Sequence, residues 1–171
     1  SAIHESARLI LWLEKKMKSL VAAGSIDERF TPPHSSIHVG MIHSGIAPNV
    51  IADNAVFSWD TRVIPNDKLE NIISEFEQHC NSREKELQKI FPDFEIKTTE
   101  LHPPVPPLDT KEDQNIVSIL QKINPIKNLG TVAYAAEAGQ FAEAGIESII
   151  CGPGSIDQAH RANEFIEKKE L

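Results

Sequence analysis

Apolar residues recur at helical spacing over two long stretches of the chain. In the first stretch, residues 3–21, the apolar positions include Ile3, Ala7, Ile10, Leu13 and Met17. Positions three and four residues apart form one face of an α-helix. The second stretch, residues 69–90, has the same spacing and follows Asp67, a residue type that favours the N-cap. The pattern predicts two long amphipathic helices, and Gly24 is expected to end the first.

Between and after these helices, three segments alternate between apolar and polar residues, as β-strands do. They span residues 36–43, 55–64 and 94–101. In the first strand the alternation places three side chains on one face, namely Ile37, Val39 and Met41. The segments predict a three-stranded antiparallel sheet with both helices on one face.

The order helix, strand, strand, helix, strand indicates an α+β domain. One further strand before residue 1 would complete the split βαβ unit of ferredoxin-like domains. We therefore expect residues 1–102 to form a ferredoxin-like domain that lacks its first strand. The following segment, His102-Pro-Pro-Val-Pro-Pro-Leu108, is stiff and extended, and it marks the boundary between two domains.

Residues 103–171 alternate between helical and apolar segments. Helices are expected near 111–123 and 138–144, and a buried strand at 148–151 ends in the turn Gly152-Pro-Gly-Ser. Cys151, at the end of that strand, is expected in the core. This order is typical of an α/β layer, but the segment is short for an independent core.

Composition narrows the range of partners. Lys and Arg number 17 against 25 Asp and Glu, which gives a net charge of −8. Binding to nucleic acid or to an anionic membrane would require a basic excess, so neither partner is expected. The chain has no apolar run long enough to span a bilayer. Its two cysteines are typical of a reducing compartment, so a cytoplasmic location is expected.

The seven histidines form no local cluster of metal-ligand spacing. His38 and His43, five positions apart on a strand, should face opposite sides of the sheet. His160 follows the glycine turn after a strand, where open α/β sheets place ligand-binding groups. Glu164, four residues later, is positioned to orient its imidazole. A surface or capping role for His160 is the alternative.

Three other residues have both a structural and a functional interpretation. Arg62 shares a strand face with Asp60, so it forms either a weak exposed ion pair or a fork for a carboxylate substrate. Asn49 is either a turn residue or an amide donor to a ligand oxygen. Glu137 lies among small residues, either at a helix start or in a site.

Several segments resemble those of a known family. Tyr134-Ala-Ala-Glu-Ala-Gly-Gln-Phe-Ala-Glu-Ala-Gly-Ile and Cys151-Gly-Pro-Gly-Ser-Ile-Asp-Gln-Ala-His resemble the C-terminal signature of acetylornithine deacetylases, which belong to the M20 family of dinuclear zinc amidohydrolases and peptidases. Pro48-Asn-Val-Ile-Ala-Asp, leading to Asp60-Thr-Arg, resembles the second motif of that family. Related desuccinylases and carboxypeptidases usually carry a Ser/Thr-Asp pair where this chain has Ala136-Glu137. The resemblance covers essentially the whole chain.

The resemblance implies a lid or dimerisation domain over residues 1–102, followed by the C-terminal part of a zinc-peptidase-like catalytic domain over 103–171. By position, His160 matches a zinc ligand, and Arg62 matches the lid arginine that meets the substrate carboxylate. Asn49 matches an asparagine that one subunit of the homodimer contributes to its partner's active site. Glu137 and Gly152 match positions that line the substrate pocket.

The function implied for the whole protein is hydrolysis of N-acetylornithine to ornithine and acetate, in arginine biosynthesis, with two zinc ions. The remaining metal ligands and the general base belong to a part of the family pattern that this chain does not contain. We therefore expect no catalytic residue in the chain, no activity and no tightly held zinc. Two alternatives are another M20 hydrolase (a desuccinylase or a carboxypeptidase) and a non-catalytic ferredoxin-like dimerisation or binding module.

Overall fold

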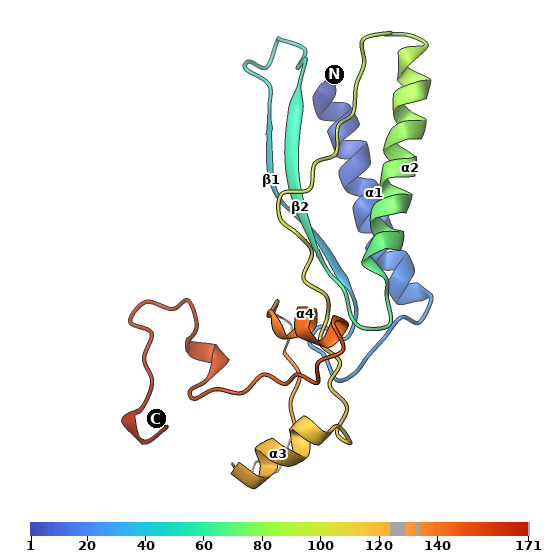
Figure 1. The fold of residues 1–171 in the computed structure, drawn as a ribbon. Coiled ribbons are helices and arrows are strands. Elements are labelled where there is room, and N and C mark those ends of the chain that lie inside the picture. Colours follow the sequence, from blue (N-terminus) through green and yellow to red (C-terminus); the bar gives the residue numbers. More distant parts are fainter. Residues whose placement is uncertain (124–128, 133, 171) are drawn as a thin grey trace. The chain divides into compact units, whose positions relative to one another are not determined.

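The computed structural model describes residues 1–123, 129–132 and 134–170. The chain divides into two compact units: Ser1–Pro107 with the described part of Asn128–Ala135, and the described parts of Leu108–Lys127 and Ala136–Leu171. The first unit contains α1 (Ala2–Ala22), β1 (Ser36–Ser44), β2 (Ala55–Arg62) and α2 (Leu69–Gln88) (Figure 1). The second contains α3 (Asn115–Ile123), α4 (Ala138–Glu143) and the 3₁₀ turns η1 (Ile156–Gln158) and η2 (Lys168–Glu170).

Both long helices predicted from the sequence are present, and α1 ends at the expected glycine. Gly24 has a φ of 81°, in the left-handed region that glycine adopts without strain. The Gly24 N–H donates to the carbonyl of Val21 at 3.0 Å, and the Ser25 N–H donates to that of Leu20 at 3.1 Å. These are the two bonds of a Schellman motif, which satisfies carbonyls that the helix end would leave unpaired.

The hairpin of β1 and β2 contains a bulge that the alternating pattern does not reveal. The strands are antiparallel, and the register shifts between Val39 and Met41, so that Met41 lies opposite Ser58. The extra residue, Gly40, reverses the alternation of side chains beyond it. Met41 therefore lies on the face opposite Val39, with 58% of its surface exposed. The prediction that Ile37, Val39 and Met41 share one face is wrong for Met41.

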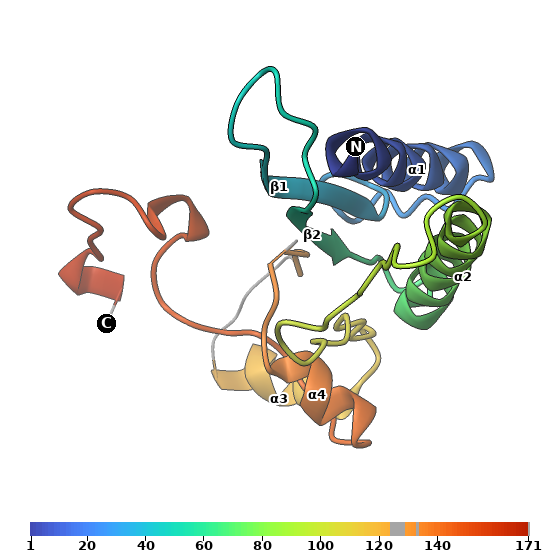
Figure 2. The same cartoon turned by 90° about the horizontal axis from the view of Figure 1, so that it is seen from above.

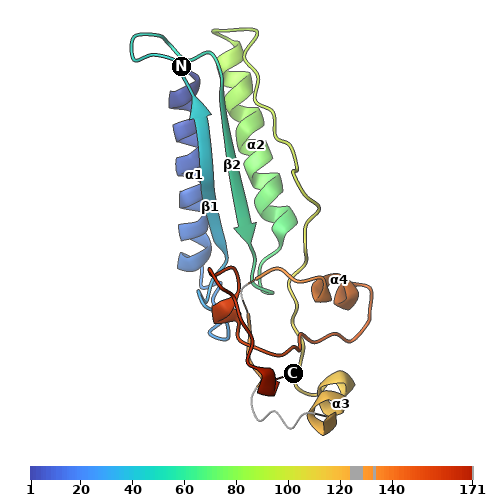
Figure 3. The same cartoon turned by 90° about the vertical axis from the view of Figure 1, so that its left-hand side faces the viewer.

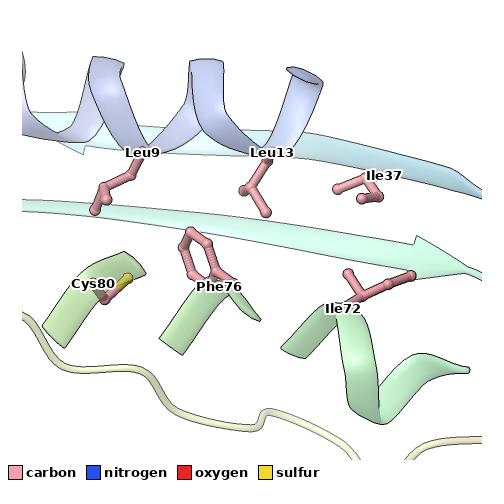
Figure 4. Close-up of a cluster of buried hydrophobic side chains, with 6 residues drawn as sticks. All are labelled: Leu9, Leu13, Ile37, Ile72, Phe76 and Cys80. Carbon is pink, nitrogen blue, oxygen red and sulfur yellow. The ribbon is translucent and has the colours of Figure 1, made fainter. Parts of the chain in front are cut away.

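Both helices pack on one face of the hairpin, as predicted (Figures 2 and 4). The core contains Leu9, Leu13, Ile37, Ile72, Phe76 and Cys80. Phe76 of α2 lies between the two tryptophans, with its ring centroid 5.5 Å from that of Trp12 and 5.2 Å from that of Trp59. Such aromatic pairs add about 0.5–1.5 kcal/mol beyond the burial of apolar area. The core thus joins α1, α2 and both strands.

The predicted third strand, residues 94–101, is not a strand. Instead, Ile96 packs against the core, and its N–H donates to Glu84 Oε2 at 2.8 Å. In a split βαβ sheet the last strand pairs with the first strand and not with the hairpin. None of the described residues forms that first strand, so the segment has no strand partner. Within the described residues the fold is α+β with a two-stranded antiparallel sheet, and the ferredoxin-like topology stays a prediction.

Asp67 does not cap α2, whose N-cap is Lys68. Its carboxylate instead accepts hydrogen bonds from the hydroxyls of Ser25 and Ser35, each at 2.5 Å. Ser35 is fully buried and also accepts the N–H of Ile64 at 3.0 Å. Asp67 thereby joins the end of α1, the start of β1 and the end of β2.

The second unit has short helices and little buried surface. Helix α3 begins four residues later than expected, and the expected strand 148–151 forms no ladder. Among the described residues of this unit, Val117 and Gly139 are the buried ones. Cys151 is exposed, so its expected place in a core is wrong for this structure. No helix in the described ranges has both the length and the apolar character needed to cross a membrane.

Candidate functional site

Arg62 is the last residue of β2 and lies on the sheet face opposite the helices. It alternates with Phe57 and Trp59, which pack against the core, so its side chain points away from them. Its Nε is 3.6 Å from Asp60 Oδ2, and 64% of the Arg62 side chain is exposed. An exposed pair of this kind contributes under about 1 kcal/mol to stability. The guanidinium is therefore accessible to a carboxylate ligand.

Asn49 lies at the other end of the hairpin. It is exposed, in the loop of residues 45–54, within a turn in which the Val50 N–H donates to the carbonyl of Ala47 at 3.1 Å. Strand β2 separates this loop from Arg62 by seven residue steps of about 3.3 Å, or about 23 Å in all. Side chains of this length do not bridge such a distance. Asn49 and Arg62 of one chain therefore do not contact the same small ligand.

The bulge at Gly40 also changes the positions of two histidines. His38 lies opposite Asp60 and His43 lies opposite Val56, so both occupy the face that carries Arg62. The prediction that His38 and His43 face opposite sides is wrong, because the bulge adds one residue between them. A glycine inside a strand is a known sign of a bulge, and Gly40 was the available signal.

His160 adopts a left-handed backbone conformation, with a φ of 61°. Its N–H donates to Glu164 Oε2 at 3.1 Å, and the residue is exposed. The Glu164 carboxylate thus binds the backbone of His160, whereas the sequence suggested that it would orient the imidazole. This bond stabilises a turn that a residue other than glycine adopts at some cost.

Glu137 and Gly152 are both exposed in the second unit. Glu137 occupies the N-cap position of α4, and its carbonyl accepts the N–H of Gln140 at 3.0 Å. A carboxylate at this position interacts favourably with the helix N-terminus. A side chain at Gly152 would meet no atom within 4 Å, so packing within this chain does not require a glycine there.

His160 is the only candidate metal ligand that the sequence predicts. A catalytic zinc ion normally takes three protein ligands. Within the ranges that the structure describes, no group of three or more His, Cys, Asp or Glu side chains is placed to hold a metal ion. The residues described around His160 do not fit a complete zinc site by themselves.

A partly buried ion pair of the first unit joins its two helices. The buried carboxylate of Glu5, on α1, accepts hydrogen bonds from Arg83 of α2, with Nε at 2.6 Å and Nη2 at 3.0 Å. The bond from Arg83 is the main reason that the pKa of Glu5 lies below its usual value, against the opposing effect of burial. This pair holds the start of α1 to α2, and none of the predicted site residues belongs to it.

Comparisons with known proteins agree with the resemblance. A peptidase dimerisation domain model of the M20 family matches residues 1–88. The chain is 30% identical to an acetylornithine deacetylase of Myxococcus xanthus over all 171 residues, which are 43% of that protein. It is 31% identical over 162 residues to one of Pectobacterium carotovorum subsp. carotovorum, covering 88% of this chain and 39% of the relative. The chain thus spans about two fifths of the length of these relatives.

Proposed function

Because the chain belongs to the M20 family, whose peptidase dimerisation domain matches its residues 1–88, we propose that it is part of a metal-dependent hydrolase that deacetylates N-acetylornithine. Water is added across the amide bond. The acyl C–N bond breaks, acetate leaves with the new oxygen, and the amine takes the proton. The observation that carries this proposal is the alignment of all 171 residues with an acetylornithine deacetylase, including the segment from Glu137 to His160.

Within this proposal, residues 1–102 are the lid and dimerisation domain, and residues 103–171 are the C-terminal part of the catalytic domain. Arg62 holds the α-carboxylate of the substrate. Its exposure at the end of β2 supports this role, because a planar guanidinium can then donate two parallel hydrogen bonds to a carboxylate. Asp60, beside it, keeps the head group near the end of the strand.

Asn49 serves the site of a second copy in a homodimer. The distance of about 23 Å between the two ends of β2 supports this assignment, since one chain cannot bring Asn49 and Arg62 to the same substrate. A second subunit can place its own Asn49 beside Arg62. In this arrangement each active site requires both subunits.

The second unit supplies His160 as a metal ligand, with Glu137 and Gly152 lining the substrate pocket. The carboxylate of Glu137 would meet the cationic side chain of ornithine, by complementarity of charge. The two zinc ions of the family pattern, a cytoplasmic location and a place in arginine biosynthesis belong to the same proposal, as does the absence of nucleic-acid and membrane partners. For the 171-residue chain alone we expect no hydrolysis and no tight zinc binding, and calorimetric titration with zinc tests the second expectation.

The test uses Arg62→Lys in the full-length protein. Lysine keeps the charge but loses the second parallel hydrogen bond, worth about 1.5–3 kcal/mol, so kcat/KM should fall by about 10- to 150-fold. The variant should also discriminate less between N-acetylornithine and its carboxamide analogue, while its melting temperature stays unchanged. Arg8→Lys is the matched control, since Arg8 is another exposed arginine paired with a carboxylate, at 3.0 Å from Glu5.

Other outcomes would favour the alternatives. Faster turnover of N-succinyl amino acids or dipeptides would indicate another hydrolase of the M20 family. A full-length protein that dimerises but hydrolyses none of these substrates would indicate a non-catalytic dimerisation module. Unchanged discrimination in Arg62→Lys would leave Arg62 as a surface partner of Asp60.

A further inference from the structure

The loop of residues 45–54 is held against the first turn of α1. The N–H of Ala2 donates to the carbonyl of Ala52 at 3.0 Å. Ala52 is only 6% exposed, whereas the loop residues around it are exposed. Figure 3 shows the loop beside the N-terminus of α1. Exposed loops are ordinarily more mobile than the elements that they connect, and this hydrogen bond ties the loop to α1.

Further contacts hold the start and the end of the same loop. Gly45 has a φ of 73°, and a Cβ there would lie 3.3 Å from Cδ1 of Ile3, on the first turn of α1. The hydroxyl of Ser44 donates to the carbonyl of Asn54 at 2.6 Å, which closes the base of the loop. We call the hydrogen bond of Ala2 with Ala52, together with the close approach of the Ile3 side chain to Gly45, the loop–helix contact.

The first turn of α1 is a suitable support because it is itself held in place. Glu5, three residues after Ala2, forms its paired hydrogen bonds with Arg83 of α2. The loop is thereby connected through α1 to the second helix and the core. Asn49 lies in the middle of this supported loop.

We propose that the loop–helix contact positions Asn49 for catalysis in the partner subunit, an inference that rests on the role proposed above for Asn49. A polar group contributes fully to a reaction only when it is held close to its productive position, and an error of about 1 Å can cost up to 100-fold in rate. Gly45, Ala52 and Ile3 are positioning residues in this scheme, and Asn49 is the residue that touches the substrate.

The first test compares Gly45→Ala with Gly24→Ala by hydrogen exchange. Both glycines have positive φ, 73° and 81°, so alanine strains the backbone at either position. A side chain at Gly24 meets nothing, whereas one at Gly45 presses on Ile3. We expect similar losses in melting temperature, but faster exchange in residues 45–54 for Gly45→Ala only. Equal exchange of this loop in both variants would overturn the loop–helix contact as its support.

The second test measures kinetics of the full-length enzyme. Gly45→Ala should lower kcat/KM by about tenfold in the wild-type background. It should leave kcat/KM unchanged in a variant that already carries Asn49→Ala. Gly24→Ala should have no effect on kcat/KM in either background. A loss of equal size with and without Asn49 would overturn the proposal. An enzyme that requires Asn49 but tolerates Gly45→Ala would overturn the proposal alone, whereas one that tolerates Asn49→Ala would overturn the role of Asn49 itself. If Gly45→Ala does not fold, Ser44→Ala loosens the loop base without backbone strain and should show the same dependence on Asn49.

Discussion

The two units of the chain place their large apolar residues differently. In the first unit Phe76 is 2% exposed and lies between two tryptophans. In the second unit Phe141 is 53% exposed, and the apolar side chains of Ile123, Phe165 and Ile146 are exposed as well. Both units have exposed apolar residues, but the first also has a cluster of buried ones, whereas Val117 is the large apolar residue buried in the described part of the second.

The difference shows what each pattern requires in order to form a core. Two amphipathic helices on one face of a hairpin cover each other, so the first unit closes within its own elements. The apolar segment 148–151 of the second unit has the character of a buried strand, which requires neighbouring strands and layers on both faces. The described residues of that unit provide neither. We therefore expect the first unit to be stabilised by contacts among its own elements. The stability of the second unit should depend on surfaces outside that unit.

The largest expected difference between the units is in how much stability each loses when an aromatic ring is removed. Phe76→Ala should lower the free energy of unfolding by about 3–5 kcal/mol, because it leaves a cavity in the core. Phe141→Ala should change it by less than about 0.5 kcal/mol. Chemical denaturation followed by tryptophan fluorescence measures the effect in the first unit, where Trp12 and Trp59 lie, and circular dichroism also follows the helices of the second unit. Equal losses would show that the second unit also has a tight core.

Thiol labelling gives the next largest contrast. Burial, followed by the nearby charge of Glu77, raises the pKa of Cys80 to about 11, whereas Cys151 is exposed. If labelling of Cys80 requires an opening of about 4 kcal/mol, it should be about a thousandfold slower than labelling of Cys151. Mass spectrometry of the labelled peptides measures the two rates. Comparable rates in the absence of denaturant would contradict the stability assigned to the first unit.

A smaller difference between the units is expected when one carboxylate in each is replaced by an amide. Glu5→Gln weakens a charged, buried pair with Arg83 and should cost about 1.5–3 kcal/mol at pH 7. Glu147→Gln, at an exposed carboxylate that accepts the N–H of Ile116 at 2.9 Å, should cost under about 0.5 kcal/mol. The pKa of Glu5 is lowered on folding. The contribution of Glu5 to the free energy of unfolding is therefore fully present above pH 4.5, and it is lost as the pH falls through the pKa of the folded state. The cost of Glu5→Gln should therefore shrink in acid, and a cost that is independent of pH would contradict the ion pair.

The smallest expected effect is the pH slope that His79 contributes. Burial lowers the pKa of His79 below 6.5, and the positive charge of Arg83 lowers it further. The negative charge of Glu5 opposes both effects. The unfolded chain then binds more protons than the folded one, so stability falls as the pH decreases from 6.5 toward the folded pKa. Urea melts of His79→Gln between pH 7 and 5 should show a smaller slope than the wild type.

Much of the first unit followed from local patterns. The helical spacing predicted α1 and α2, and Gly24 ended α1 because only a residue free of a Cβ adopts its φ at no cost. The face that carries Arg62 also followed, since alternation with Phe57 and Trp59 sets it directly. These features depend on neighbours within a few residues, which a sequence pattern contains.

Other features were decided by contacts between distant residues. The bulge at Gly40 depends on the partner strand, and it moved Met41 and His43 to the opposite face. Asp67 bonds Ser25 and Ser35, about forty and thirty residues away, in place of capping α2. The sequence by itself determined α1, β1, β2 and α2, because periodicity is local, but its alternation over residues 94–101 predicted a strand that does not form. Only the tertiary structure decided the register, the partner of Asp67 and the separation of Asn49 from Arg62, because each of these depends on which distant segment provides the hydrogen-bonding group.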